Sequence, residues 1–577
     1  MLNIQKLKQH FEGDISTSVE DMAKHAYDAS IFHIPPEVVL YPKTVADIQH
    51  VVEFVSAEKA LNPELSITAR SAGTDMGGGS VNDSIILDFT KYINKIIEVK
   101  EEQGSVRNFS HHHDRPIETA GYAITQPGVY YRDFEKETLK HNLIMPSYPA
   151  SRGLCAMGGI MANNSGGEKS LSYGKTENYL ETIWAVLADG KEYEFGPLTE
   201  PELEAKMRLS TYEGEIYRKI FHLIRANYDV LQKAKPSVSK NSAGYYLWNV
   251  WDKKTFNMSK LLVGSQGTLG LVTKGKFRLV TPHTKSKMLV MFLHDVAPLG
   301  SIVNEVMKHN PETFESFDDH TMSLAIKFLP AMIKKMASGS KGTGSFGGPL
   351  GLIKLGLEFL PEVWMTLTGG MPKLILIAEF TGDDEAELLR RAQETQKTVV
   401  EKFHLQTHIT KNDQESQKYW TVRRESFSLL RERVKNLHSA PFIDDFAVHP
   451  ADLPTFLPKL DAIFKKYPSL IYTIAGHAGD ANFHIIPLMD LTKESERAII
   501  PKLSDEVYDL IIEYKGTITA EHNDGLVRGP YLEKMYGPEV FNLFKEVKHV
   551  FDPNNIFNPH KKTDATEEYL IKHIRTD

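Results

Sequence analysis

Short apolar runs alternate with amphipathic stretches through the first half of the chain. Residues 46–60 repeat apolar side chains every three or four positions behind Thr44, which predicts a capped helix. The apolar runs at 65–69 and 84–87 come next, and each predicts a strand. This alternation indicates a domain in which helices pack on a sheet.

Beyond residue 287 the apolar runs are separated by longer amphipathic stretches, of which residues 384–403 are one. The pattern predicts a second mixed α+β layer with a core of its own. A further strand-like run at 516–520 ends in Glu521 and His522, and residues 515–560 are expected to fold back toward the first domain. We expect the strands of the second layer at 288–292, 312–317, 374–380, 442–448 and 471–486.

Length and composition indicate a globular protein of more than one domain. A chain of 577 residues exceeds what one hydrophobic core usually serves. Its hydrophobic content of 41% and charged content of 25% are ordinary globular values. The formal net charge of -8 supplies no positive field, so we expect no nucleic-acid partner.

Cys155 is the only cysteine, so the chain can form no internal disulfide and cannot supply the four thiolates of an iron–sulfur cluster. Residues 1–30 have mixed charges and no apolar core. They therefore match neither a signal peptide nor a membrane anchor, and a cytoplasmic protein is expected.

The most apolar region is 350–367, where Lys354, Glu358 and Glu362 fall on one helical stripe. This pattern favours a helix packed on the core or forming a lid. The alternative is an interfacial helix that gives peripheral contact with the inner face of a membrane. The histidines at 111–113 lie in a polar stretch and indicate a solvated loop rather than a metal-binding tract.

Three glycine-rich segments, at 68–79, 158–167 and 264–270, each follow or interrupt an apolar run. Such loops expose successive backbone N–H groups and can form a concave site for a pyrophosphate. Three of them in one half of a chain predict a large phosphate-bearing cofactor held by the backbone. None has the context of a Rossmann fingerprint, and none ends in the Lys-Ser or Lys-Thr pair of a P-loop.

Residues 476–484 lie between two apolar runs and predict a hairpin with His477 and His484 facing each other at its mouth. Two neutral imidazoles on rigid strands form most of a metal site that still lacks a carboxylate. Glu521, which His522 follows, is the candidate for that carboxylate.

Seven collinear segments carry a resemblance to a known family. They are residues 35–42, 69–79, 146–173, 263–273, 476–484, 519–524 and 551–559. In this order they resemble the FAD-linked oxidase superfamily that includes vanillyl-alcohol oxidase and p-cresol methylhydroxylase. The second half is similar to the branch containing D-lactate dehydrogenase, the FAD subunit of glycolate oxidase and D-2-hydroxyglutarate dehydrogenase.

The resemblance implies an α+β fold. A two-part FAD-binding domain of the p-cresol methylhydroxylase type is followed by a ferredoxin-like mixed α+β substrate domain, or cap. The expected divisions are a helical extension at 1–34, the FAD domain at 35–285, the substrate domain at 286–515 with an insertion at about 330–370, and a returning segment at 516–577.

The resemblance also implies which residues hold the cofactor. The expected FAD is noncovalent, because Asp75 stands where relatives that attach flavin covalently often have histidine. The first loop would hold the pyrophosphate through Ser71, Ala72, Gly73, Thr74, Asp75 and Gly78. The rest of the cofactor would contact Pro146, Gly158, Gly159, Asn164, Gly166, Val272 and Asn558.

By the same resemblance, His477, His484 and Glu521 would bind a divalent metal such as Zn²⁺ or Mn²⁺. His522 is the expected general base, because imidazole titrates near neutrality. Arg423, in a Trp-x-x-Arg pattern, would clamp a carboxylate, although Arg423 could instead belong to a salt-bridged helix face. Asn482 is expected to hydrogen-bond the substrate, while Lys240 and Tyr245 would border it.

Together these features predict FAD-dependent oxidation of a D-2-hydroxy acid, with D-lactate first and D-2-hydroxyglutarate and glycolate next. Electrons would pass to a quinone, a cytochrome, an electron-transfer flavoprotein or a separate iron–sulfur subunit. One alternative is a non-redox flavin enzyme of the alkyl-dihydroxyacetonephosphate synthase type, whose run of histidines is not matched at Thr519-Ala520. The other is a non-catalytic flavin-binding subunit of a larger complex.

Overall fold

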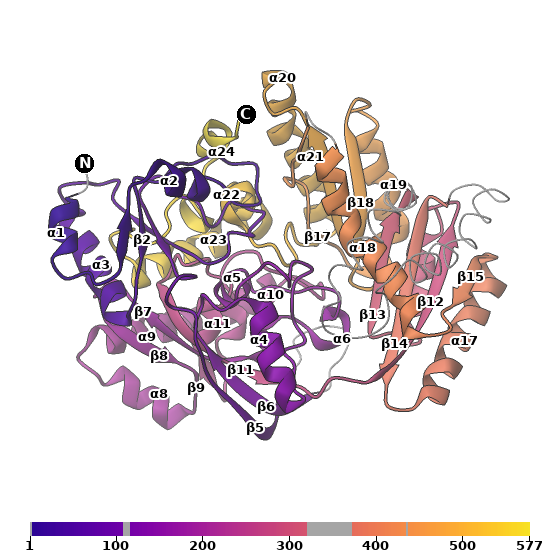
Figure 1. Cartoon of the computed structure of the whole chain (residues 1–577), viewed down its shortest axis with the longest axis horizontal. Helices are drawn as coiled ribbons and strands as arrows, with labels where there is room; N and C mark the ends of the chain where they lie inside the picture. The colour runs from indigo at the N-terminus through magenta and orange to yellow at the C-terminus, as the bar shows by residue number, and fades with distance from the viewer. Residues whose placement is uncertain (1–2, 108–115, 320–371, 434–436, 577) are drawn as a thin grey trace, which may run out of the picture. The chain divides into compact units, whose positions relative to one another are not determined.

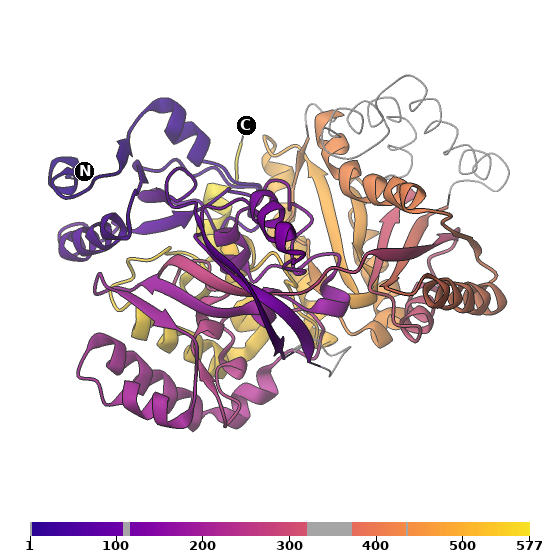
Figure 2. The same cartoon turned by 60° about the horizontal axis from the view of Figure 1, so that its bottom comes forward.

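The computed structural model describes residues 3–107, 116–319, 372–433 and 437–576. Contacts divide the chain into two compact units (Figures 1 and 2). The first unit consists of Met1–Pro282, Ala440–Ala447 and Leu491–Asp577, and the second of His283–Ser439 and Val448–Asp490. The tracts 111–113 and 350–367 and the insertion at about 330–370 lie outside the described residues.

The first unit contains a four-stranded sheet in the order β1 (Asp14–Ser16), β2 (Val38–Tyr41), β4 (Ile85–Asp88) and β3 (Ile67–Arg70). β4 runs parallel to both β2 and β3, whereas β1 is antiparallel to β2. Helix α3 (Val45–Glu58) buries Ile48, Val51 and Val55 in the same core as these strands. The helix at 46–60 and the strands at 65–69 and 84–87 are thus confirmed.

A second, five-stranded antiparallel sheet of this unit has the order β5 (Ile96–Val106), β6 (Ile117–Thr125), β11 (Leu271–Leu279), β7 (Leu180–Val186) and β8 (Glu192–Phe195). Its apolar face shares one core with α5 (Met157–Asn163), α9 (Tyr212–Ala226) and α23 (Leu532–Phe551). The remaining elements of the unit are α1 (Ile4–Lys8), α2 (Val19–His25), α4 (Tyr131–Thr138), η1 (Leu139–His141), α6 (Ser170–Tyr173), α7 (Thr176–Tyr179), β9 (Pro197–Leu198), α8 (Glu200–Met207), α10 (Tyr228–Ala234), η2 (Leu247–Asn249), β10 (Phe256–Asn257), α11 (Ser259–Leu262), β17 (Phe446–Ala447), α20 (Glu494–Arg497), α21 (Ile499–Glu513), α22 (Gly525–Arg528), η5 (Gly529–Tyr531), η6 (Lys562–Asp564) and α24 (Glu567–His573).

The second unit is built on one antiparallel sheet in the order β15 (Gln406–Ile409), β12 (Lys285–Leu293), β14 (Leu374–Gly382), β13 (Thr313–Asp318), β18 (Ile471–His477), β19 (Asn482–Met489) and β16 (His438–Ser439). Helix α17 (Glu385–Phe403) packs across β12, β14 and β15, and Asp384 caps its first turn, as the pattern at 384–403 predicts. The other elements are α12 (Leu299–Met307), α18 (Asp413–Arg433), η3 (Pro450–Asp452), α19 (Leu453–Phe464) and η4 (Ala478–Asp480).

Two expected strands are wrong. Of 442–448 only Phe446 and Ala447 are extended in a strand, because Asp445 takes a left-handed conformation with φ of 70°. The run 516–520 has a single bridge, from Thr517 to Ala447. Within it, the Thr517 hydroxyl donates to the Thr519 carbonyl and accepts from the Thr519 amide, which replaces strand pairing by a local turn.

The boundaries of the units differ from those expected from the sequence. The N-terminal segment 1–34 contributes β1 to a sheet as well as two helices. Residues 491–515, expected in the substrate domain, cluster with the first unit, where α21 buries Leu503, Val507 and Ile511. None of the helices in the described parts of the chain combines the length and apolar character that crossing a bilayer requires.

Candidate functional site

The three glycine-rich segments meet through side-chain hydrogen bonds in the first unit. Asp75 Oδ2 accepts from the amides of Gly77 and Gly79 at 3.0 and 2.6 Å, which orders the first loop from within. Asp75 Oδ1 accepts from Asn163 Nδ2 of the second segment at 2.6 Å. Asn163 Oδ1 in turn accepts from Gln266 Nε2 of the third segment at 3.2 Å. Segments far apart in the sequence thus form one cluster.

Asn558 closes this cluster from the C-terminal part of the chain. Its Nδ2 donates to the carbonyls of Gly79 and Gln266 at 2.9 and 2.7 Å, and its Oδ1 accepts from Thr68 Oγ1 at 2.8 Å. The side chain is 1% exposed. Asn558 therefore supports the loops, and its amide hydrogens are already used within the protein.

The space around the cluster fits a group that approaches the backbone closely. A Cβ atom on Gly158 would lie 2.3 Å from Ser71 Oγ, so the first loop and the start of α5 touch there. A Cβ atom on Gly159 would meet nothing within 4 Å. Gly78 has φ of +82°, a conformation that favours glycine. The half-exposed residues 71–76 and this open space suit a dinucleotide cofactor.

The other predicted cofactor residues lie in or beside these segments. Pro146, Asn164 and Gly166 are buried, whereas Val272 is half-buried on β11. Tyr245, expected near the substrate, is instead fully enclosed beside the third segment, where its hydroxyl lies 2.6 Å from Thr268 Oγ1. Burial raises the pKa of the Tyr245 phenol.

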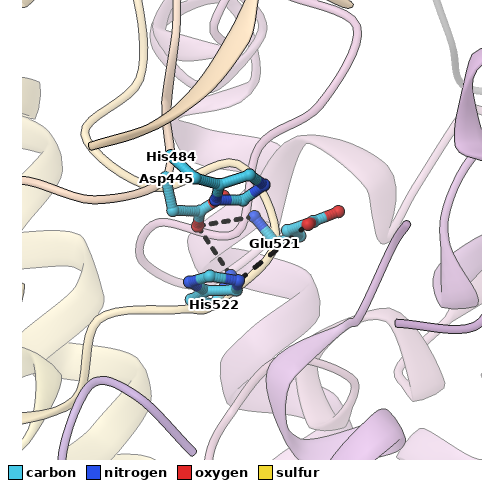
Figure 3. A group of neighbouring side chains, drawn as sticks. All are labelled: Asp445, His484, Glu521 and His522. Atoms are coloured by element: carbon cyan, nitrogen blue, oxygen red, sulfur yellow. Dashed lines mark hydrogen bonds and ion pairs between the residues drawn. The ribbon is translucent and has the colours of Figure 1, made fainter. Parts of the chain in front are cut away.

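The side chain of Asp445 binds the backbone amides of the Glu521–His522 pair. Asp445 Oδ2 accepts from Thr519 Oγ1 at 2.7 Å and from the amides of Glu521 and His522 at 2.9 and 2.6 Å. One potential ligand atom from each of Asp445, Glu521 and His522 lies within 4.8 Å of the others (Figure 3). This geometry brings two carboxylates and an imidazole together in the first unit.

The side chains of the pair have partners of their own. His522 Nδ1 lies 2.8 Å from Asp444 Oδ2, and His522 Nε2 lies 3.9 Å from Glu521 Oε1. The other Glu521 oxygen lies 3.4 Å from Lys240 Nζ. Asp444 is fully buried, but the His522 side chain is 21% exposed. The contact between His522 Nδ1 and Asp444 Oδ2 is close but lacks the angle of a hydrogen bond, so it acts on the imidazole through charge.

Lys175 contacts the segment that carries the Glu521–His522 pair. Its Nζ donates to the Ala520 carbonyl at 2.7 Å and also contacts Ser242 and the Asn241 carbonyl. Burial lowers the pKa of Lys175 to about 7, against the opposing effect of nearby carboxylates. The residue therefore links the Glu521–His522 pair to the segment around Lys240.

In the second unit the hairpin expected at 476–484 is present. β18 and β19 pair with His477 opposite Asn482 and Ala475 opposite His484. The rings of His477 and His484 lie edge to face, with centroids 5.2 Å apart. Asn482 is fully buried.

Two predicted residues of this unit meet on a carboxylate that the sequence did not single out. His477 Nδ1 lies 2.7 Å from Glu315 Oε1, and Arg423 Nη2 lies 3.2 Å from Glu315 Oε2. Glu315 comes from β13 and is 1% exposed. Arg423, on α18, thus pairs with a buried carboxylate on a strand of the same unit.

Two family models match the chain in order. The one described as "FAD binding domain" matches residues 36–196, and the one described as "FAD linked oxidases, C-terminal domain" matches residues 282–562. The chain belongs to the FAD-linked oxidases. The first match contains two of the three glycine-rich segments, and the second contains both histidine constellations.

Curated relatives of this FAD-linked oxidase are identical to it at about a quarter of the aligned positions. D-2-hydroxyglutarate dehydrogenase of Haemophilus influenzae is 27% identical over 96% of this chain and 50% of its own length. Glycolate oxidase subunit GlcD of Bacillus subtilis is 25% identical over 93% and 91%. D-lactate dehydrogenase of Archaeoglobus fulgidus is 24% identical over 91% and 90%. The chain spans about half the length of the first of these.

Solved structures confirm the fold class. p-Cresol methylhydroxylase aligns with a TM-score of 0.63 at 15% identity, covering 97% of this chain and 96% of its own. 4-Ethylphenol oxidase from Gulosibacter chungangensis gives 0.63 at 14%, covering 96% and 95%. An alkyldihydroxyacetonephosphate synthase gives 0.60 at 14%, covering 97% and 84%. At these identities the likeness shows the fold alone.

Sequence reasoning missed Asp444, Asp445, Lys175 and Glu315 in this FAD-linked oxidase. The only local signal was an acidic pair at 444–445 inside an apolar run, because burying two carboxylates in a strand is costly unless partners hold them. Lys175 and Glu315 carry no local signal, because each is recognised by partners from other parts of the chain.

Proposed function

We propose that this FAD-linked oxidase oxidises a D-2-hydroxy acid to the 2-oxo acid, with D-lactate as the first substrate to test and D-2-hydroxyglutarate and glycolate next. The names of the curated relatives support this substrate class. The observation that carries the proposal is His522, an accessible imidazole 2.8 Å from the Asp444 carboxylate in the unit that contains the FAD-binding segments. FAD, when bound, accepts a hydride from the carbinol carbon.

In this proposal the chain's own residues bind the acid and move its proton. Arg423 pairs with the substrate carboxylate through two parallel hydrogen bonds. His522 Nε2 takes the hydroxyl proton, and the Asp444 carboxylate stabilises the imidazolium that results. Asn482 is a further hydrogen-bonding group for the substrate.

We further propose that His477, His484 and Glu521 bind a divalent ion, Zn²⁺ or Mn²⁺. Two imidazoles and one carboxylate are a donor set that suits these ions and leaves positions for a substrate. The ion, when bound, makes the hydroxyl of a chelating 2-hydroxy acid more acidic. The electron acceptor in this proposal is a quinone, a cytochrome, an electron-transfer flavoprotein or a separate iron–sulfur subunit.

Anaerobic stopped-flow reduction of the bound flavin tests the proposal. The three acids are offered to the wild-type protein, to His522→Ala and to His141→Ala, which alters an exposed histidine of the same unit. Loss of a general base is expected to slow reduction by about 10²–10⁴-fold in His522→Ala, and His141→Ala should match the wild type. Equal rates in all three proteins would refute the assignment of His522, and no bleaching by any acid would refute the substrate class.

Metal analysis tests the second part. The purified protein should contain an equimolar divalent ion that is depleted in His477→Ala, His484→Ala and Glu521→Gln. A protein that stays metal-free after dialysis against Zn²⁺ and Mn²⁺ yet bleaches normally would show that oxidation needs no ion.

A further inference from the structure

One buried carboxylate of the second unit contacts two of the residues that the proposed function uses. Glu315 reaches His477 Nδ1 with one oxygen, at 2.7 Å, and Arg423 Nη2 with the other, at 3.2 Å. Strand pairing fixes this arrangement, because Ser316 of β13 lies opposite Gly476 of β18, the neighbours in sequence of Glu315 and His477.

Arg423 compensates the buried charge of Glu315. A carboxylate that is 1% exposed needs a positive partner, and the permanently charged guanidinium of Arg423 supplies it. Because a carboxylate has no proton to donate, the contact at 2.7 Å is one in which His477 Nδ1–H donates to Glu315. This tautomer leaves the lone pair on Nε2, the form in which histidine binds a metal ion.

The same contact leaves donors on Arg423. Glu315 engages Nη2, whereas Arg423 Nε is buried and has no hydrogen-bond partner within the described parts of the chain. Nε is thus a donor still to be satisfied in a guanidinium whose Nη2 is already engaged. A buried guanidinium N–H of this kind suits the carboxylate of an acid substrate.

We infer that Glu315 is a positioning residue that sets the ligand nitrogen of His477 and the orientation of Arg423 at once. Metal binding and recognition of the acid are then coupled through one carboxylate. This inference rests on the proposed function, and it adds to that function the residue that links its two binding elements.

Zinc affinity of the full FAD-loaded chain tests the positioning of His477. Glu315→Gln keeps the size of the side chain and removes its charge. Asp318→Asn is the matched control, because Asp318 is on the same strand, is 7% exposed and accepts from the Ile474 amide at 2.8 Å. Competition with a chromophoric chelator is expected to show about 10–100-fold weaker Zn²⁺ binding in Glu315→Gln and a change within about threefold in Asp318→Asn.

The visible spectrum of the Co²⁺-substituted protein gives a second readout, which a general loss of stability would not produce. Glu315→Gln is expected to shift the ligand-field bands, since the donor strength and angle of His477 change, while Asp318→Asn leaves them in place. A Glu315→Gln protein with wild-type FAD content, Zn²⁺ affinity within threefold of wild type and an unshifted Co²⁺ spectrum would overturn the inference.

A double-mutant cycle tests the coupling to Arg423. Arg423→Met removes the positive partner and leaves the buried charge of Glu315 uncompensated, so the Glu315–His477 contact should be disturbed and Zn²⁺ affinity should fall by about threefold or more. In the Glu315→Gln background the same change should have no effect beyond error. Additive effects in the cycle would show that Glu315 does not couple the two residues.

His477→Ala, measured in parallel, separates the two proposals. If His477→Ala loses Zn²⁺ affinity and Glu315→Gln does not, the positioning role of Glu315 is wrong and the metal site stands. If His477→Ala binds Zn²⁺ as the wild type does, the metal proposal and the role of Glu315 both fail.

Discussion

Replacing Asp445 by asparagine tests how the Glu521–His522 pair is held in place. Asp445 Oδ2 accepts three hydrogen bonds, from Thr519 Oγ1 and from the amides of Glu521 and His522. Asparagine has nearly the same shape and tolerates the φ of 70° at this position. Its amide oxygen can still accept all three bonds, so the variant removes the charge and little else.

The magnitude follows from the three bonds. A hydrogen bond to a charged group contributes about 1.5–3 kcal/mol, and one to a neutral group contributes about 0.5–1.5 kcal/mol. The difference is about 1 kcal/mol for each bond, so Asp445→Asn should weaken the local structure by about 3 kcal/mol. At 1.36 kcal/mol for each factor of ten, local opening becomes about 100-fold more frequent.

Hydrogen exchange at the Glu521 and His522 amides measures this opening directly. Exchange of peptides covering 517–524 should accelerate by about 100-fold in Asp445→Asn. Thr519→Val, which removes one donor and keeps the carboxylate, should accelerate it by about tenfold or more, since one hydrogen bond to a charged group, about 1.5–3 kcal/mol, is lost. Flavin reduction by the substrate should slow in Asp445→Asn while FAD content stays unchanged.

Two results would refute this reasoning. Exchange in Asp445→Asn within threefold of the wild type would show that the charge of Asp445 does not hold the two amides. Faster exchange with an unchanged rate of flavin reduction would show that the backbone position of His522 is not critical for its proposed role as base.

Three further predictions concern Asp28, Lys175 and Arg423. Burial raises the pKa of Asp28 to about 6. Between pH 4 and 6 the folded chain therefore keeps a proton that the unfolded chain has released. The free energy of unfolding falls as pH rises through this range, by up to about 3 kcal/mol. Asp28→Asn should remove that slope from urea unfolding midpoints measured across the window; an unchanged slope would contradict it. Burial lowers the pKa of Lys175 to about 7, so the unfolded chain binds more protons between pH 7 and 10 and the free energy of unfolding rises with pH there. Lys175→Met should lose this rise. Because the Ala520 carbonyl loses its donor, urea titrations at pH 7 should also show the variant destabilised by at least about 1 kcal/mol. A variant as stable as the wild type would count against the buried contacts of Lys175. Arg423→Lys should raise the KM for the acid by about tenfold or more with a smaller effect on kcat, because an ammonium cannot make two parallel bonds; a kcat effect alone would argue against the carboxylate clamp.

The sequence alone determined the elements whose cause is local. The helix behind Thr44, the glycine-rich loops and the hairpin carrying His477 and His484 all follow from periodicity, capping and turn chemistry over a dozen residues. The order of those motifs along the chain was enough to indicate the FAD-linked oxidase family. Local patterns failed at 442–448 and 516–520, where buried Asp445 and two threonine hydroxyls compete with strand pairing.

Only the tertiary structure decided which partners hold the functional side chains. Glu315 and His477 are 162 positions apart, and Asp445 and the Glu521 amide are 76 apart, so no periodicity connects either pair. A buried carboxylate is stable only where strand pairing or a turn brings donors to it, and those donors come from distant segments. The sequence therefore indicates the residue types that do the chemistry, whereas only the folded chain shows which carboxylates contact them.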